Sequence, residues 1–136
     1  MKQGQPLTDA VIRNAKPGPS DRWLTDGQRT RGKGRLALRV TRAGTKIFYF
    51  RYRTQDGKYV AMAIGAYGHG GLSLEAARRE VARLQELHRK EDSKDVRAHL
   101  EAQAEADRLA QEATERETRE RQLREAAERE LLARYT

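Results

Sequence analysis

Apolar and polar residues alternate along residues 35–65 with the period of two that is typical of β-strands. The alternation runs through RLALRVTR, TKIFYFRYRT and KYVAMAIG, which are separated by Ala43-Gly44 and by Gln55-Asp56-Gly57. Asp-Gly between two such runs is a strong signal for a hairpin turn. The pattern therefore predicts a three-stranded antiparallel sheet with one apolar face. The residues expected on that face are Leu36, Leu38, Val40, Phe48, Phe50, Tyr52, Val60, Met62 and Ile64.

A helical period replaces this alternation in SLEAARREVARLQELHRK, residues 73–90. Its apolar stripe is formed by Leu74, Ala77, Val81, Leu84 and His88. Ser73 is expected to cap the helix, and Thr8 or Asp9 to cap a shorter one in TDAVIRNA. Because the apolar face of the sheet needs a cover, we expect the longer helix to pack against it.

Residues 94–134 form a third segment, rich in Ala, Glu, Arg and Leu and free of Gly and Pro. Asp92-Ser93 should separate it from the preceding helix. No apolar heptad runs through it, so we expect a solvated linker helix or a helix that binds a partner. The sequence predicts an α+β fold with a three-stranded sheet packed on one α-helix, followed by a long polar helical extension. The predicted domains are 1–91 and 92–136.

The charge of the chain is concentrated in its first half. The net charge is +8, and residues 1–71 hold 14 Lys or Arg against 4 Asp or Glu. Residues 72–136 hold 14 against 16. A small basic segment with interspersed aromatic residues is typical of nucleic-acid binding. The alternation indicates which face would bind, because Arg35, Arg39, Tyr49, Arg51 and Arg53 lie opposite the apolar face.

No arrangement of residues typical of catalysis or metal binding is found in the sequence. There is no cysteine, and His69, His88 and His99 do not have the spacing of zinc ligands. We expect His88 to be packed in the apolar stripe, and the loop at 65–71 to be a turn and not a phosphate-binding motif. No cofactor, metal or small-molecule substrate is predicted. No apolar run is long enough to span a membrane, and the N-terminus has no signal core, so we expect a cytosolic protein.

Five segments occur in the order and spacing of a known family. They are LTDAVIRNAKPG at 7–18, WLTDG at 23–27, GRLALRVTRAGTKIFYFRYRTQDGK at 34–58, AIGAYG at 63–68 and SLEAAR at 73–78. Together they resemble the N-terminal arm-type DNA-binding domain of prophage integrases, which are tyrosine recombinases. The resemblance implies a bacterial protein whose sheet enters the major groove of double-stranded DNA at arm sites.

The candidate DNA-binding residues combine the cationic sheet face with positions implied by the resemblance. They are Lys16, Arg35, Arg39, Thr41, Arg42, Lys46, Tyr49, Arg51, Arg53, Lys58 and Tyr59. Lys46 shares the parity of the core residues, so we expect it to reach DNA only from the turn after Gly44. The basic stretch QRTRGKG at 28–34 is expected to contact a neighbouring phosphate or to form a mobile loop.

The catalytic part of a tyrosine recombinase is not found in the sequence. None of the three histidines is followed by the Arg of an H-x-x-R element, and Tyr135 is not expected to be a nucleophile. We therefore expect no DNA cleavage by this chain, which is a fragment of an integrase or a stand-alone relative. The alternatives are a stand-alone DNA-binding regulator, an excisionase-like architectural factor, and a protein-interaction module whose helix at 94–134 oligomerises. In an integrase, other protomers are the candidate partners of this helix. RNA binding is the last alternative.

Overall fold

A computed structural model describes residues 5–27 and 34–135 of the chain. The chain divides into two compact units, Met1–Arg97 and Ala98–Thr136. The domain boundary predicted after residue 91 stays a prediction, and the first unit continues to Arg97. Residues 28–33, which make up most of the basic stretch QRTRGKG, lie outside the described residues.

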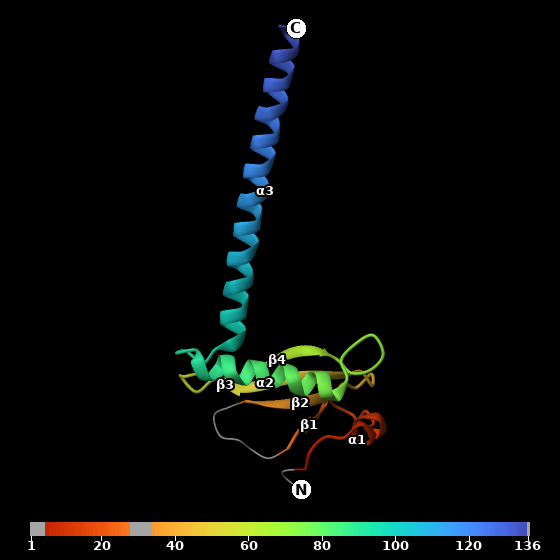
Figure 1. The fold of residues 1–136 in the computed structure, drawn as a ribbon. Coiled ribbons are helices and arrows are strands. Elements are labelled where there is room, and N and C mark those ends of the chain that lie inside the picture. Colours follow the sequence, from red (N-terminus) through yellow and green to blue (C-terminus); the bar gives the residue numbers. More distant parts are fainter. Residues whose placement is uncertain (1–4, 28–33, 136) are drawn as a thin grey trace. The chain divides into compact units, whose positions relative to one another are not determined.

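The first unit contains an antiparallel sheet with the strand order β1-β2-β3-β4 (Figure 1). Its strands are β1 (Arg22–Thr25), β2 (Arg35–Val40), β3 (Lys46–Arg53) and β4 (Tyr59–Ala66). The α+β fold with an antiparallel sheet is confirmed, but the prediction of three strands was wrong. The additional strand, β1, is only four residues long and lies in a segment rich in turn formers. It is ordered by pairing with β2, from Arg22 opposite Val40 to Thr25 opposite Ala37.

The core lies between the sheet and α2 (Leu74–Lys90), which packs on β2, β3 and β4. The predicted alternation on β2 and β3 is confirmed, because all six of the expected core side chains are buried. The five stripe residues of α2 are buried as well. On β4, in contrast, the inward side chains of Val60, Met62 and Ile64 are only half-buried. β4 is an edge strand, so it has a neighbouring strand on one side only.

Side-chain caps begin both helices of the first unit. Thr8 accepts a hydrogen bond from the Val11 amide at the start of α1 (Asp9–Asn14), at 3.1 Å. Ser73 accepts one from the Ala76 amide at the start of α2, also at 3.1 Å. These bonds satisfy N–H groups that have no partner within the helix. The prediction for Ser73 is confirmed, and Thr8 is the cap of the two candidates named for α1.

Asp26, which directly follows β1, joins three parts of the first unit. Its Oδ1 accepts the Leu7 amide at 2.7 Å and Arg78 Nη2 at 3.0 Å, and its Oδ2 accepts Arg78 Nε at 2.9 Å. Arg78 also donates to the Leu7 carbonyl at 2.6 Å. The N-terminal segment and the end of β1 are thereby fastened to α2.

α2 ends at Lys90, and α3 (Val96–Arg134) begins after a short connection. The break expected at Asp92-Ser93 is confirmed. Val96 is fully buried, and the Tyr52 hydroxyl donates to Asp95 Oδ1 and accepts the Arg97 amide, each at 2.8 Å. The first two residues of α3, Val96 and Arg97, are therefore anchored to the first unit and belong to it.

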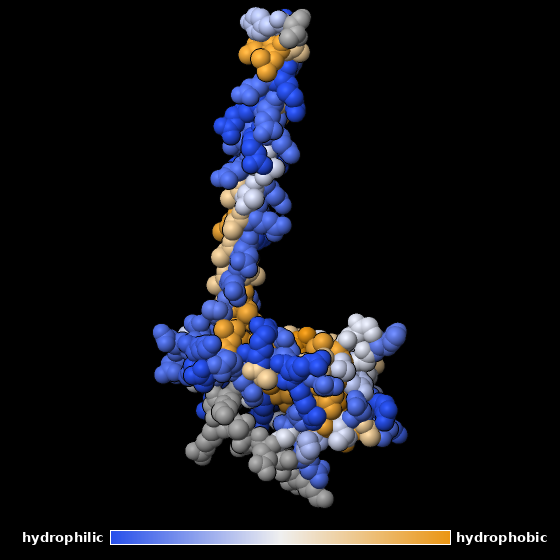
Figure 2. All heavy atoms as spheres, viewed as in Figure 1, coloured by the Kyte–Doolittle hydropathy of each residue, from blue (hydrophilic) through white to orange (hydrophobic). Residues whose placement is uncertain are grey.

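The second unit is the rest of α3. Ion pairs at helical spacing stabilise it, such as Arg108 with Glu105 and with Glu112. The helical extension is confirmed, whereas its polar character stays a prediction. Four large apolar side chains are exposed along it, and Figure 2 shows hydrophobic residues near its C-terminal end. They are Leu109, Leu123, Leu131 and Leu132.

Candidate nucleic-acid interface

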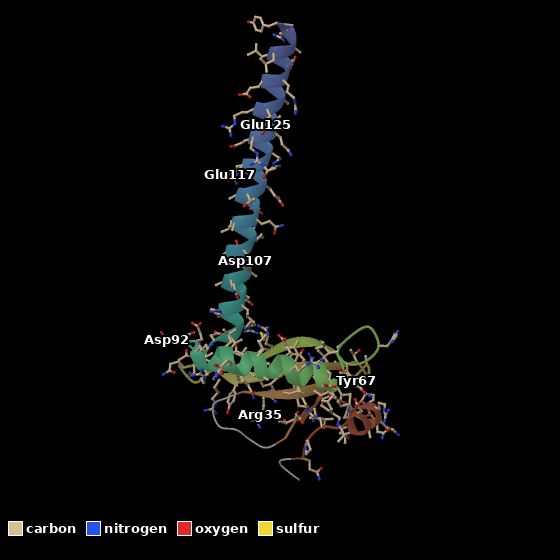
Figure 3. The ribbon with its side chains drawn as sticks, viewed as in Figure 1. Arg35, Tyr67, Asp92, Asp107, Glu117 and Glu125 are labelled. Atoms are coloured by element: carbon tan, nitrogen blue, oxygen red, sulfur yellow. The ribbon has the colours of Figure 1, made fainter. Side chains whose placement is uncertain are left out.

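Strand alternation places four arginines of the sheet, Arg35, Arg39, Arg51 and Arg53, on the face opposite α2. Residues opposite one another in neighbouring strands share a face, so Trp23, Arg39 and Ile47 lie together, as do Arg35 and Arg51. We call this surface the outer face. Its aromatic and charged members are Trp23, Arg35, Arg39, Tyr49, Arg51, Arg53 and Tyr59. Arg35 is labelled in Figure 3, at the lower side of the sheet.

Two arginines of the outer face lie directly opposite each other on neighbouring strands. Arg35 on β2 pairs in register with Arg51 on β3. Like charges in this position destabilise a sheet. Within the described residues, no carboxylate comes within 4.0 Å of either guanidinium. The pair is therefore a local concentration of positive charge that an anionic ligand would relieve.

Trp23 supports Arg51 on this surface. The Arg51 guanidinium carbon lies 4.7 Å from the centre of the Trp23 ring, a cation–π distance. Trp23 also meets Tyr49 edge to face, with ring centres 4.9 Å apart and an interplanar angle of 67°. The tryptophan is 38% exposed, so the surface presents an aromatic side chain beside its charges.

Arg39 is held by partners on both sides. Its Nε donates to Asp21 Oδ2 at 2.8 Å, its Nη2 donates to the same oxygen, and its Nη1 donates to the Tyr49 hydroxyl at 3.1 Å. The bond from Arg39 lowers the pKa of the Asp21 carboxyl, against a smaller opposing effect of burial. The same bond raises the pKa of Arg39. Both groups are therefore charged at neutral pH.

Arg53 and Tyr59 form the far end of the outer face. They pair in register across β3 and β4, and the Arg53 guanidinium carbon lies 4.1 Å from the centre of the Tyr59 ring. Arg53 Nη2 also donates to the Tyr59 hydroxyl. Behind this pair, the Arg53 carbonyl oxygen lies 2.8 Å from Nε2 of His88, which is buried as predicted.

The other predicted residues lie around the outer face and not on it. Thr41 and Arg42 lie in the β2–β3 turn, where the Thr41 hydroxyl accepts the Thr45 amide at 3.0 Å. Lys58 ends the β3–β4 turn, with Nζ 3.8 Å from Asp56. These turns are at opposite ends of β3, so they extend the cationic surface along its length.

Lys16 and Lys46 lie near α1 instead. Lys46 Nζ donates to the Arg13 carbonyl oxygen at 3.0 Å, at the C-terminal turn of the helix. Lys16 has an exposed side chain, and its carbonyl accepts Arg22 Nη1 at 2.7 Å. Lys46 is on the core side of β3, in agreement with its parity, so the structure does not bring it together with Arg51 and Arg53.

Sequence reasoning missed two residues of this surface, Trp23 and Asp21. WLTDG was noted as a motif, but its alternation was not interpreted as a strand, although Trp23 and Thr25 flank an inward Leu24. Asp21 directly follows Pro19 and Ser20, so at the level of sequence it fits an ordinary turn. Its contact with Arg39 joins residues 18 positions apart, and no local pattern predicts such a pairing.

The part of the chain that the structure describes shows neither a metal site nor a membrane-spanning helix. There, no three His, Cys, Asp or Glu side chains are grouped so that they could hold a metal ion. Across residues 5–27 and 34–135, no helix combines the length and apolar character needed to cross a membrane.

A comparison with protein families gave a match to the chain. The model of a family described as the arm DNA-binding domain matches residues 7–103, which contain the whole sheet, α2 and the start of α3. The match covers most of the chain, and this arm-type domain is found in phage integrases. A comparison with curated proteins gave no match.

Proposed function

Because the chain belongs to the arm DNA-binding domain family, we propose that its outer face binds double-stranded DNA at short arm-type sites. The chain acts as the arm-site reader of a phage-type integrase, a tyrosine recombinase, and supports DNA integration. It does not itself cut DNA, since the sequence has no H-x-x-R element and no nucleophile with a base beside it.

The unrelieved Arg35–Arg51 pair is the observation that carries this proposal. Phosphates neutralise closely spaced arginines, and a guanidinium can also bind a guanine edge through two parallel hydrogen bonds. The major groove of B-DNA is about 12 Å wide and admits a β-ribbon. We infer that β2 and β3 enter the groove, while the turns that carry Arg42 and Lys58 contact the backbone on either side.

The aromatic residues of the outer face favour duplex DNA over single strands. Proteins that bind single strands stack bases on exposed rings. Here, Arg51 lies over the Trp23 ring and Arg53 over the Tyr59 ring. A base that stacked on the same ring face would have to displace the guanidinium. The rings are therefore better suited to holding arginines in place than to accepting bases.

Selection of bound sites from a pool of random duplexes tests this function. With the full chain and a stated salt concentration, we expect enrichment of a short common sequence. Binding should fall steeply as salt is raised, because counterion release contributes strongly to the affinity. A pool that shows no enrichment, together with equal competition by RNA and duplex DNA, would contradict the proposal.

A second role, contact between protomers through α3, is favoured by the exposed leucines of this helix. Leu109 is 53% exposed and Leu123 is 71% exposed. Sedimentation of the full chain and of a chain that ends at Arg97 would test this role. The truncation keeps Val96 and the Arg97 amide, which the first unit needs. A dimer that is lost on truncation supports the role, and a monomeric full chain at high concentration contradicts it.

A further inference from the structure

Asp21 places a carboxylate against a surface that is otherwise suited to binding anions. One of its oxygens, Oδ2, accepts two N–H groups of Arg39, with Nε at 2.8 Å. The other, Oδ1, accepts the Arg42 amide at 3.2 Å. Asp21 thus joins an outer-face side chain of β2 to the backbone of the β2–β3 turn. A carboxylate at this position repels phosphates and so weakens the general attraction of the outer face for DNA. The presence of Asp21 therefore requires another explanation.

The contacts restrict the Arg39 guanidinium to one orientation. A guanidinium has five N–H donors, and three hydrogen bonds to Asp21 and Tyr49 are made here. Two donors are left for a ligand. An acceptor pair such as O6 and N7 of guanine requires two donors in a fixed plane. The partners of Arg39 leave it able to make such a bidentate contact.

The partner on the other side of Arg39 is itself held in place. The Tyr49 ring meets Trp23 edge to face at 4.9 Å, so the hydroxyl that accepts Arg39 has a defined position. Arg39 and Asp21 also cancel each other's charge, and their side chains are only about a third exposed. The pair therefore gives the outer face a guanidinium of fixed orientation but adds little net charge to it.

We propose that Asp21 is a positioning residue for DNA sequence readout. It holds Arg39 toward the base edges and removes one positive charge from the nonspecific attraction to phosphates. This inference rests on the proposed function, duplex binding by the outer face. It adds that discrimination between sequences depends on a residue that itself contacts no DNA.

The test is the substitution Asp21→Asn in the full chain, which removes the charge and nearly preserves the shape. Two probes are compared by fluorescence anisotropy: the duplex that wild-type protein enriches from a random pool, and the random pool itself. We expect tighter binding of the random pool, with a salt dependence steeper by up to about 0.9 in log–log slope. The affinity ratio between the enriched duplex and the pool should fall about tenfold, the value of one good bidentate contact.

Two further variants separate orientation from charge. Glu75→Gln makes the same change in net charge on α2, where Glu75 is 83% exposed and pairs with Arg79. It should leave the affinity ratio unchanged. Tyr49→Phe removes the hydroxyl that accepts Arg39 and keeps the ring against Trp23. It should lower the ratio, as Asp21→Asn does, although it leaves the net charge unchanged.

Three results would overturn the inference. If Asp21→Asn strengthens binding of both probes equally, the carboxylate only reduces charge. If it weakens both and lowers the melting temperature, its role is structural. An unchanged ratio in Tyr49→Phe would show that the position of Arg39 does not govern readout. None of these results contradicts the proposed function, which is duplex binding by the outer face. A wild-type chain that binds no duplex would contradict the proposed function itself, and the inference with it.

Discussion

Replacing Asp26 by Ala should destabilise the first unit more than the loss of an exposed ion pair on α2 does. The Asp26 side chain is only 14% exposed, and it accepts three hydrogen bonds, from the Leu7 amide and from Arg78. The substitution removes all three. It leaves the amide of Leu7, a buried residue, without its acceptor.

The size of the effect follows from the surroundings of the two donors. A hydrogen bond between a buried amide and a carboxylate contributes about 1.5 kcal/mol. Arg78 is 44% exposed, so water screens its ion pair, and the pair adds roughly 0.5–1 kcal/mol. The expected loss is about 2 kcal/mol in the free energy of unfolding. For a unit of this size, the melting temperature should fall by roughly 8–16 °C.

Urea unfolding followed by tryptophan fluorescence measures this loss. Trp23 is the single tryptophan and lies on β1, so its signal reports the first unit and not α3. Glu75→Ala, which removes an exposed i,i+4 pair with Arg79, is the matched control and should cost less than about 0.5 kcal/mol. A loss below about 0.5 kcal/mol in Asp26→Ala would show that these hydrogen bonds do not stabilise the first unit.

The same contact predicts a dependence on pH. Burial raises the pKa of Asp26, but the bonds from Arg78 and from the Leu7 amide outweigh it, and the net pKa is lowered. A carboxyl with a lowered pKa stabilises the fold fully above its unfolded pKa of about 3.9. That contribution is lost as the pH falls through the lower, folded pKa. The stability difference between wild type and Asp26→Asn should therefore shrink below about pH 4, and a constant difference would contradict this account.

Two further substitutions test the packing of β3. Tyr52→Phe removes the hydroxyl that binds Asp95 and the Arg97 amide, and should cost about 1–2 kcal/mol in urea unfolding; an unchanged midpoint would contradict this. Burial raises the pKa of Tyr52 to about 12, so this contribution should persist to about pH 10 and be lost as the pH rises through 12. Gly34→Ala should cost more than about 2 kcal/mol, because φ is +76° and the new Cβ would lie 2.5 Å from Phe50 Cζ. A Gly34→Ala variant as stable as wild type would show that this position relaxes freely.

The sequence was sufficient for those parts of the fold that depend on local periodicity. The alternation in β2 and β3 identified the buried side chains, and the spacing in α2 identified the helix face that covers them. Each of these patterns repeats over at least three positions, so the assignment of the buried face does not depend on any single side chain.

The parts that were missed depend on contacts between distant residues. β1 has four residues, and its order comes from pairing with β2. The arginine side chains that pair with Asp21 and Asp26 are 18 and 52 positions away along the chain, respectively. Because Asp is common in turns, the sequence alone gives no sign that these two carboxylates have distant partners. The outer-face arginines and the tyrosines beside them, Tyr49 and Tyr59, were predicted from the sequence, whereas Trp23 and Asp21, which hold Arg51 and Arg39, were not.

Binding of DNA to the outer face can be tested by comparing two double variants. Arg51→Ala with Arg53→Ala removes two charges from the outer face, and Arg79→Ala with Arg83→Ala removes two from α2. Binding of the enriched duplex is measured over a range of salt concentrations. The account predicts weaker binding and a log–log salt slope reduced by up to about 2 for the outer-face variant, with little change for the α2 variant. Equal weakening by both variants, or a wild-type affinity that hardly changes with salt, would contradict it.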